Sequence, residues 1–304
     1  MNDSQVVSGE NSGYLHQIFD CTFSKATSAD LDLEVREQAI LTLGHILCRA
    51  AEALVDQDLN AKVLPFIMDR LQNESYRIVS IKVITMIIDS NIDSAHFDIS
   101  SIVPTIISTL FSFLRKSHRH LRLSSLQCLL SLFKNYKSLP VGTNVTQDLE
   151  YLLSETDLQV LSTNLLVLSY VMKLSGPNLS LLNDLKARII PKVLNILVEN
   201  PHLVSIGIGA QSLNEFWAAI MEIGGPSLHE FCLESLLRVG NNASFSKMSH
   251  MIVAKSIAII CTKVDRTLMM KIMQQIVGLL ESNKAPESLI HLGLLSIGEL
   301  GARS

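Results

Sequence analysis

A proline recurs at one position of an apolar motif along the chain, and this repetition constrains the fold more than any other feature. The motif reads Lys62-Val-Leu-Pro65-Phe-Ile, then Ser101-Ile-Val-Pro104-Thr-Ile, then Arg188-Ile-Ile-Pro191-Lys-Val. Successive prolines are 39 and 87 residues apart, and the second spacing is close to two periods of 43. Because proline is tolerated near the first turn of a helix and breaks the interior, this register predicts a repeated helix with a defined start or kink.

A second pattern recurs on what we interpret as the partner helix. Gly44 follows Leu43 near the start of the chain, and Gly298 follows Ile297 near its end. The two glycines are 254 residues apart, which is equivalent to six repeats of about 42 residues. Repeats of this length, each built from two or three helices, are typical of HEAT and armadillo arrays.

Apolar residues between these motifs follow helical spacing, and glycine, proline and asparagine clusters divide the runs. We find no convincing alternating strand. The sequence therefore predicts an all-α protein, a HEAT-type α-solenoid of about seven helix pairs. The first helices are expected near 13–27, 58–72, 99–116, 146–153, 180–199, 226–239 and 266–282, and their partners near 32–51, 75–90, 119–136, 157–174, 202–223, 245–263 and 286–300.

The predicted organisation is one array preceded by a short tail. Residues 1–12 are polar, and we expect them to form a disordered lead-in. Residues 13–304 then form the HEAT-repeat solenoid. The last repeat helix is followed only by Gly301-Ala-Arg-Ser304, without a polar capping repeat. We therefore expect the array to be a fragment of a longer one, or to receive further repeats from a separate chain.

Composition excludes several classes of protein. Hydrophobic residues make up 48% of the chain and charged residues 18%, so the chain is too apolar to remain disordered. The formal net charge of −4 argues against a nucleic-acid binder, which usually carries a basic surplus. The longest uncharged run, Ile99–Leu114, is shorter than the roughly 20 residues of a membrane span. We expect a soluble intracellular protein without a membrane partner.

Several ordered local strings carry a family resemblance. They include Asp30-Leu-Asp-Leu-Glu-Val-Arg-Glu-Gln-Ala39, Gly44-His-Ile-Leu-Cys48, Phe113-Leu-Arg-Lys-Ser117, Leu153-Ser-Glu-Thr-Asp-Leu-Gln-Val160 and Leu294-Leu-Ser-Ile-Gly-Glu-Leu-Gly301. In these strings and their order, the chain resembles the middle of the cullin-associated, neddylation-dissociated family of HEAT-repeat regulators across roughly residues 14–301.

The resemblance implies a partner and a role. The family wraps around a cullin bound to its RING subunit and exchanges substrate-receptor modules on cullin–RING ubiquitin ligases. The blocking elements belong to the family's terminal repeats, so a central segment implies part of the curved spine. A cytoplasmic and nuclear protein, without catalysis, cofactor or small-molecule substrate, is expected.

The densest basic cluster is the candidate binding site. Arg115, Lys116, Arg119 and Arg122 lie within eight residues, together with His118 and His120. One interpretation is a patch for an acidic partner surface such as a cullin. The alternative, which we favour because charge runs usually serve solubility, is a solvated turn between two helices. A metal site is the weakest interpretation, because no cysteine or carboxylate lies within a few positions.

Other groups have structural interpretations that we prefer. Gly207-Ile-Gly209 lacks the third glycine of a dinucleotide loop and predicts close helix packing instead. The acidic residues Asp30, Asp32, Glu34 and Glu37 are expected to complement a helix dipole. Five late methionines are expected in the repeat core rather than in an adaptable groove: Met248, Met251, Met269, Met270 and Met273.

Cysteine spacing predicts neither a zinc site nor a disulfide framework. The chain has five cysteines, and Cys48, Cys128 and Cys261 lie in apolar helical runs, where we expect small buried side chains. A karyopherin-like transport receptor or another HEAT scaffold is the alternative function. An enzyme with a helical domain has no motif to support it.

Overall fold

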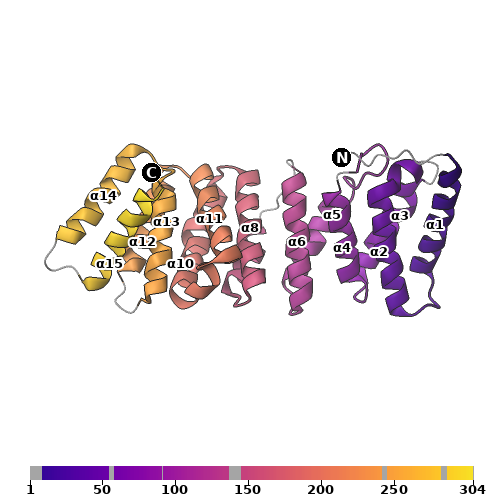
Figure 1. Cartoon of the computed structure of the whole chain (residues 1–304), viewed down its shortest axis with the longest axis horizontal. Coiled ribbons are helices and arrows are strands. Elements are labelled where there is room, and N and C mark those ends of the chain that lie inside the picture. Colours follow the sequence, from indigo (N-terminus) through magenta and orange to yellow (C-terminus); the bar gives the residue numbers. More distant parts are fainter. Residues whose placement is uncertain are drawn as a thin grey trace. The chain divides into compact units, whose positions relative to one another are not determined.

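The computed structural model describes residues 9–54, 58–90, 92–136, 145–241, 245–281 and 286–303. The regular structure in these ranges is helical, without a strand. The chain divides into two compact units, Met1–Lys137 and Ser138–Ser304. Figure 1 shows the helices of each unit side by side.

Unit 1, residues 1–137, holds three pairs of helices. Its first helices are α1 (Gly9–Thr27), α3 (Leu59–Gln72) and α5 (Val103–Leu114), and the partners are α2 (Leu33–Ala50), α4 (Arg77–Asp89) and α6 (Arg119–Asn135). A 3₁₀ turn, Ala51–Leu54, follows α2. Residues 9–12, which we expected in the lead-in, form the first turn of α1, and residues 1–8 lie outside the described part.

Unit 2, residues 138–304, continues the same alternation. It contains α7 (Val145–Tyr151), α8 (Leu158–Ser175), α9 (Leu179–Asp184), α10 (Ile190–Glu199), α11 (Gly207–Ile223), α12 (Pro226–Gly240), α13 (Lys247–Cys261), α14 (Arg266–Glu281) and α15 (Glu287–Gly301). A π-helical turn, Leu185–Ile189, joins α9 to α10 into one continuous first helix. Short 3₁₀ segments, Leu152–Ser154 and Pro201–Val204, precede α8 and α11.

Packing of second helix on second helix builds each core. In unit 1, α2 contacts α4 and α4 contacts α6; in unit 2, α8 contacts α11, and α13 contacts both α11 and α15. One face of each helix is apolar, so stacking removes a stripe of side chains from water at each contact. Ile40 and Leu43 of α2 are buried in this way, as are Phe216 and Trp217 of α11. The predicted all-α, HEAT-type solenoid fold is confirmed.

Polar contacts between neighbouring pairs give the repeat length directly. The two hydrogen-bonded residues lie 37 positions apart in the sequence for Gln72 and Thr109. They lie 42 positions apart for Asp89 and Ser131, and also for Glu150 and Lys192. In unit 2, Lys186 donates to Ser227 and Lys271 pairs with Glu230, both across 41 residues. Equivalent positions in adjacent pairs therefore face each other, and the predicted period of about 42 residues is confirmed.

The three motif prolines occupy different local settings. Pro104 lies in the first turn of α5, where its missing N–H costs no helical hydrogen bond. Pro65 lies inside α3. Pro191 directly follows the π-helical turn, which is the place where the continuous first helix changes its hydrogen bonding. The motif thus marks a helix start in one repeat and an interior irregularity in another.

Helix α8 is the one described helix that is long and apolar enough to cross a membrane. Most of it, 61% of its residues, is buried inside unit 2, where it packs against α11. It also contains the buried polar residues Ser162, Asn164 and Ser169, and the Asn164 amide donates to the Leu149 carbonyl at 2.9 Å. These contacts are those of a buried core helix.

A close approach between α2 and α4 occurs at Gly44. A β carbon at this glycine would lie 3.1 Å from both γ carbons of Val83. Gly298 occupies the matching position of α15, and there a β carbon would meet nothing within 4 Å. Equivalent positions in the sequence therefore differ in packing, since Gly44 lies in a close contact and Gly298 is open.

We expect Gly44→Leu to lower the free energy of unfolding by about 1–3 kcal/mol, because the new side chain must displace Val83 from a packed contact. Gly298→Leu is the matched control and should leave stability unchanged or slightly raised, since leucine favours helix more than glycine. Urea unfolding followed by circular dichroism measures both. Equal losses for the two variants would contradict the packing of α2 on α4.

His250 connects α13 to α15 within unit 2. Its ring is 4% exposed and meets the rings of Phe245 and His291 edge to face, both at 5.5 Å between centroids. Burial lowers the pKa of His250, and the neighbouring His291 lowers it further. The folded state therefore favours the neutral imidazole.

Because the unfolded chain takes up this proton near pH 6.5, acid should favour unfolding. We expect stability to be full above about pH 6.5 and to decline as the pH falls below it. Urea unfolding at pH 7.5 and 5.5 should show a larger loss for the wild type than for His250→Gln, which removes the titrating group. An identical pH dependence in the variant would contradict a contribution from His250.

Candidate protein-binding surface

The predicted basic cluster forms the turn between α5 and α6 in unit 1. Helix α5 ends at Leu114, and the Lys116 N–H donates to the Phe113 carbonyl at 3.0 Å. His118 starts α6 as its N-cap, since its Nδ1 accepts from the Leu121 N–H at 3.2 Å. The tight turn leaves all six residues from 115 to 120 exposed.

The four predicted binding residues do not share one environment. Arg115, Lys116 and Arg119 are exposed on the turn, whereas Arg122 lies one helical turn into α6 and is half-buried. The rings of His118 and His120 lie 6.1 Å apart. In the described ranges, no group of three or more His, Cys, Asp or Glu side chains could hold a metal ion.

A surface hollow of about 450 Å³ lies beside this turn. It is lined by Glu74, Arg77, Ile78, Lys116, Ser117, His118 and Leu121. The ionisable lining residues are Lys116 and His118 of the turn, Glu74, which precedes α4, and Arg77, the first residue of α4. The turn therefore borders a concave surface whose lining includes both charged and apolar side chains, which suits a protein side chain better than a flat patch would.

Arginines of the earlier pairs serve the fold. The Arg77 guanidinium lies 5.2 Å from the centre of the Phe113 ring and donates to the Gln72 carbonyl at 3.2 Å. Arg70 lies 5.0 Å from the Tyr76 ring centre, and Arg36 lies 5.5 Å from the same ring. The Arg36 and Arg77 contacts connect one pair to the next, whereas the contact of Arg70 with Tyr76 lies within one pair. The sequence analysis did not predict these contacts. The available signal was an aromatic residue either a few positions from the arginine or about one repeat away in the sequence.

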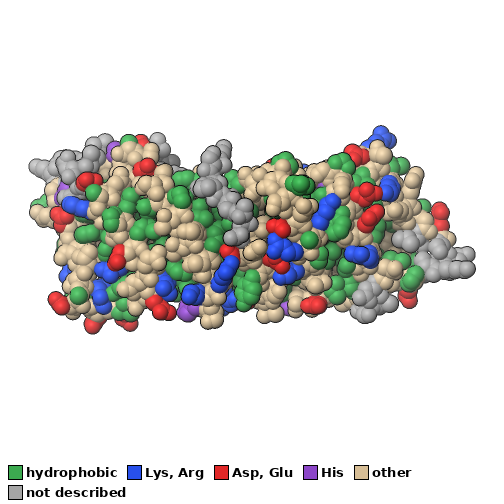
Figure 2. Space-filling model, turned by 180° about the vertical axis from the view of Figure 1, so that it is seen from behind, with side chains coloured by type: hydrophobic (Ala, Val, Ile, Leu, Met, Phe, Trp, Pro, Cys, Tyr) green, Lys and Arg blue, Asp and Glu red, His purple; other side chains and the backbone are tan. Residues whose placement is uncertain are grey.

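The charges of the surface are mixed. On the face that Figure 2 shows, Lys and Arg side chains alternate with Asp and Glu side chains among the described residues. A protein that follows a phosphate backbone needs clustered positive charge instead. This face offers short positive stretches between negative ones, as a protein-binding surface does.

Unit 2 carries an apolar row that sequence reasoning missed. Leu158, Ile206, Ile208 and Met248 are exposed large side chains, and they stand at the starts of three successive second helices, α8, α11 and α13. Each of these side chains lies within one position of the first residue of its helix, whereas the expected starts near 202 and 245 stood three to six residues before them. Exposed apolar side chains aligned along neighbouring elements are typical of protein contact sites.

Close packing explains the Gly207-Ile-Gly209 motif. A β carbon at Gly209 would lie 1.9 Å from the Leu203 carbonyl oxygen and 3.2 Å from the Leu158 side chain. Gly207 has a φ of +58°, a backbone conformation that favours glycine. The predicted structural role of this motif is confirmed. The acidic residues around Asp32 also behave as predicted, with Asp32 at the N-cap of α2 and Glu34 in its first turn.

The methionine prediction was wrong. None of the five late methionines is buried: Met248 and Met270 are exposed, and Met251, Met269 and Met273 are half-buried. Met269 and Met273 of α14 line a hollow of about 710 Å³ together with Ile297 and Leu300 of α15. Leu268, Ile272 and Ile276 form the buried face of α14, whereas Met269 and Met273 lie beside that face and open onto this hollow.

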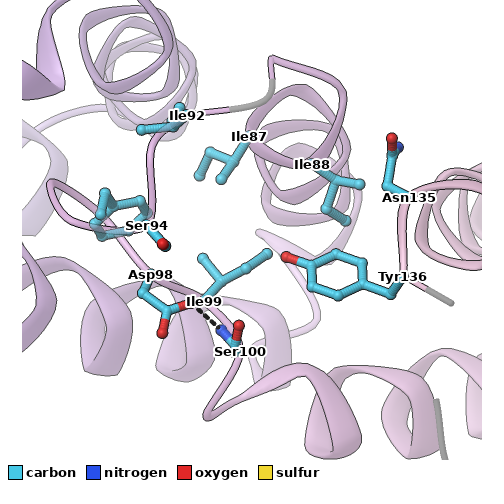
Figure 3. A pocket seen from close by; sticks show the side chains of 10 residues that line it. Ile87, Ile88, Ile92, Ser94, Asp98, Ile99, Ser100, Asn135 and Tyr136 are labelled. Atoms are coloured by element: carbon cyan, nitrogen blue, oxygen red, sulfur yellow. Dashed lines mark hydrogen bonds between the residues drawn. The ribbon is translucent and has the colours of Figure 1, made fainter. Parts of the chain in front are cut away.

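Figure 3 shows a smaller pocket in unit 1, of about 190 Å³, between the ends of α4 and α6. The Tyr136 ring lies across it from Asp98 and Ile99. Asp98 accepts from the Ser100 N–H at 2.9 Å, and hydrogen bonds to Ser100 lower the pKa of this carboxyl. Burial raises the pKa of Tyr136, and the Asp98 carboxylate raises it further. The pocket thus pairs an ionised carboxylate with a protonated phenol, without an activated nucleophile among its lining residues.

The comparisons with known proteins agree with the predicted resemblance. No protein-family model matches the chain. Cullin-associated NEDD8-dissociated protein 1 of Dictyostelium discoideum is 26% identical over 298 residues, which cover 95% of this chain and 23% of that protein. The protein of the same name from Arabidopsis thaliana is 27% identical over 301 residues, covering 95% and 24%. The predicted family resemblance is confirmed.

Other cullin-associated NEDD8-dissociated proteins match over shorter stretches. The Drosophila melanogaster protein 1 is 35% identical over 164 residues, covering 53% of this chain and 13% of that protein. This chain spans about a quarter of the length of the relatives that it matches most fully. Among solved structures, a designed armadillo repeat protein is 12% identical, with a TM-score of 0.37 and coverage of 93% and 99%.

Burial makes three of the five cysteines poor nucleophiles. Cys128 and Cys261 are buried as predicted, Cys232 is buried too, and Cys48 is half-buried. Burial raises the pKa of Cys128 and Cys232 to about 12 and that of Cys261 to about 11. A buried thiol with a raised pKa is a poor nucleophile, because the thiolate is the reactive form.

We expect Cys21, which is exposed, to react with a thiol reagent at pH 8 within seconds to minutes, and Cys48 more slowly. Cys128, Cys232 and Cys261 should react only after unfolding in guanidinium. Mass spectrometry of the labelled native and unfolded protein identifies the sites. Rapid native labelling of any of the three buried thiols would contradict their burial in the core.

Proposed function

We propose that this chain is a non-catalytic scaffold segment that binds a cullin together with its RING subunit, and that contributes to a regulator promoting exchange of substrate-receptor modules. The observation that carries the proposal is the match along 95% of the chain to proteins named for cullin association. The HEAT-type fold supports it, since stacked helix pairs present long surfaces for protein partners.

The basic turn between α5 and α6 is the proposed contact with the cullin. Arg115, Lys116 and Arg119 extend from a turn whose backbone is fixed by the His118 cap and by the Lys116 N–H bond to Phe113. Positive groups held on a rigid turn attract an acidic surface and orient it during encounter. The adjacent hollow, with Ile78 and Leu121 in its lining, offers an apolar contact beside the charges.

The chemistry of the pockets supports a binding role. In the pocket of Figure 3, the Asp98 carboxyl has a lowered pKa and the Tyr136 phenol has a raised pKa. A catalytic acid–base pair needs pKa values near neutral pH, and these shifts move both groups away from it. The mixed surface charge supports a protein partner over nucleic acid. The proposal includes a cytoplasmic and nuclear location, where cullins and such a regulator would meet, and it includes no membrane, cofactor or small-molecule substrate.

The test is a pull-down of this chain with an unmodified cullin–RING heterodimer, run beside the NEDD8-conjugated form. We expect selective retention of the unmodified form at low ionic strength, with a decline as salt screens the charges. Retention of a karyopherin cargo or a small GTPase instead would favour a transport receptor. Equal retention of both cullin forms, or of neither, would count against the proposal.

Charge reversal locates the contact. The triple variant Arg115→Glu, Lys116→Glu, Arg119→Glu should weaken cullin–RING binding about tenfold or more, because each reversed charge at an interface repels an acidic partner. Lys82→Glu is the control, since Lys82 is an exposed lysine on α4 of the same unit. Biolayer interferometry at two salt concentrations measures both. Equal affinity of the triple variant and the control would remove the basic turn from the interface.

A further inference from the structure

The turn between α5 and α6 contains a serine that the fold does not use. Ser117 lies between Lys116 and His118, is exposed, and belongs to neither helix. Other groups fix the turn, namely the Lys116 N–H bond to the Phe113 carbonyl and the His118 cap on Leu121. The Ser117 hydroxyl makes no hydrogen bond to another described residue. A reagent from solution can therefore reach this oxygen without the loss of a structural contact.

Basic side chains precede this hydroxyl on the same exposed turn. Arg115 and Lys116 stand two positions and one position before Ser117, and both are exposed. Kinases select their protein substrates partly by charge, so a kinase with an acidic substrate groove prefers a serine that follows basic residues. An exposed serine in this setting is a substrate for such an enzyme.

The preceding turn of unit 1 offers a comparison within the same chain. Ser75 lies 42 residues before Ser117, in the turn between α3 and α4, and it is exposed too. Each serine stands three residues after the end of one helix and two residues before the next, and an arginine follows each after two positions. The difference lies before the serine, where Glu74 stands in the place of Lys116. The two sites therefore share a place in the repeat and differ in charge.

The hollow beside the turn provides surroundings for a phosphate on Ser117. Ser117 lines this hollow of about 450 Å³ together with Lys116, His118 and Arg77. Lysine and arginine side chains form charge-assisted hydrogen bonds with phosphate oxygens. Glu74 lines the hollow as well, and its carboxylate opposes a phosphate. The positive charges of Lys116 and Arg77 outnumber this one negative charge, so the hollow as a whole favours the phosphate.

We propose that Ser117 is a phosphorylation site for a serine kinase with an acidic substrate groove, and that the phosphate switches off the cullin contact of the basic turn. The second part rests on the proposed function. In the transfer, the Ser117 Oγ attacks the γ-phosphorus of a nucleoside triphosphate bound to the kinase. The Oγ–P bond forms while the bond to the β,γ-bridging oxygen breaks. The nucleoside diphosphate leaves, and the hydroxyl proton passes to a carboxylate of the kinase.

The charge of the phosphate accounts for the switch. Arg115, Lys116 and Arg119 supply three positive charges on the exposed turn. A phosphoserine carries a charge of about −1.5 to −2 at pH 7, so one phosphate cancels at least half of them. An acidic partner then loses most of its electrostatic attraction to the turn. The fold should persist, because negative charge beside a helix N-terminus, here that of α6, is favourable.

Kinase treatment of the folded full chain tests the modification without a cullin. The probes are the catalytic subunit of cyclic-AMP-dependent protein kinase and the catalytic fragment of protein kinase C, each with Mg²⁺ and ATP. Peptide mass spectrometry should find phosphate on Ser117 and about tenfold less on Ser75, because only Ser117 follows basic residues. Lys116→Glu, which gives Ser117 the preceding residue of Ser75, should slow the transfer. Absence of phosphate from Ser117 with both kinases, or equal modification of the two serines, would overturn the proposal.

Biolayer interferometry with the unmodified cullin–RING heterodimer tests the switch. Phosphorylation of Ser117 should weaken binding about tenfold, and treatment with a phosphatase should restore it. Ser117→Ala should bind like the wild type and should no longer respond to the kinase. Ser75→Glu is the matched control, because it adds a negative charge at the equivalent place one repeat earlier, and it should bind like the wild type.

The charge-reversal variant of Arg115, Lys116 and Arg119 separates this switch from the cullin contact itself. If that variant weakens cullin binding and the phosphate does not, the switch is overturned and the contact stands. If neither changes the affinity, the proposed contact is wrong and the switch falls with it. A phosphate that weakens binding only when circular dichroism shows lost helix would also overturn the switch, since the effect would then come from unfolding.

Discussion

The stacking of each second helix on the next is the contact on which both units depend. A single helix pair buries only part of its apolar surface, so Ile40 of α2 leaves water only when α4 covers it. The close approach at Gly44 and Val83 shows how tight this contact is, since even one added methyl group would crowd both γ carbons. Cation–π contacts and inter-pair hydrogen bonds then hold the register that this packing sets.

Local signals made the helices predictable. Nearly every expected boundary lies within a few residues of the observed one, because Asp58, Asp157 and Ser246 cap helices and glycine or proline separates them. The period of about 42 residues was visible in the spacing of Gly44 and Gly298. The period assigns residues to equivalent positions, and that was enough to predict a HEAT-type fold before any contact was known.

Exposure was not predictable from the same signals. Gly44 and Gly298 share a motif, yet one is buried against Val83 and the other is open, because burial depends on the neighbouring pair and not on the helix itself. The methionines of α14 were misassigned for this reason. The hollow beside the basic turn combines residues from α4 and from the turn after α5, roughly one repeat apart, so only the packed structure brings Glu74 and Lys116 together.

Positive residues of unit 1 divide by what they contact. Arg36, Arg70 and Arg77 lie over aromatic rings, and the Arg77 guanidinium also donates to a backbone carbonyl, so their charges are engaged within the fold. Lys116 lines an open hollow on an exposed turn, and the backbone of that turn is fixed by Phe113 and His118 without help from the lysine side chain. Substituting Arg77 would therefore disturb both the packing between helix pairs and the surface, whereas substituting Lys116 would change the surface alone. In a scaffold whose core is built from repeated contacts, residues such as Lys116, which the repeat does not require, can change without disturbing the stack, and the proposed cullin contact uses residues of this kind.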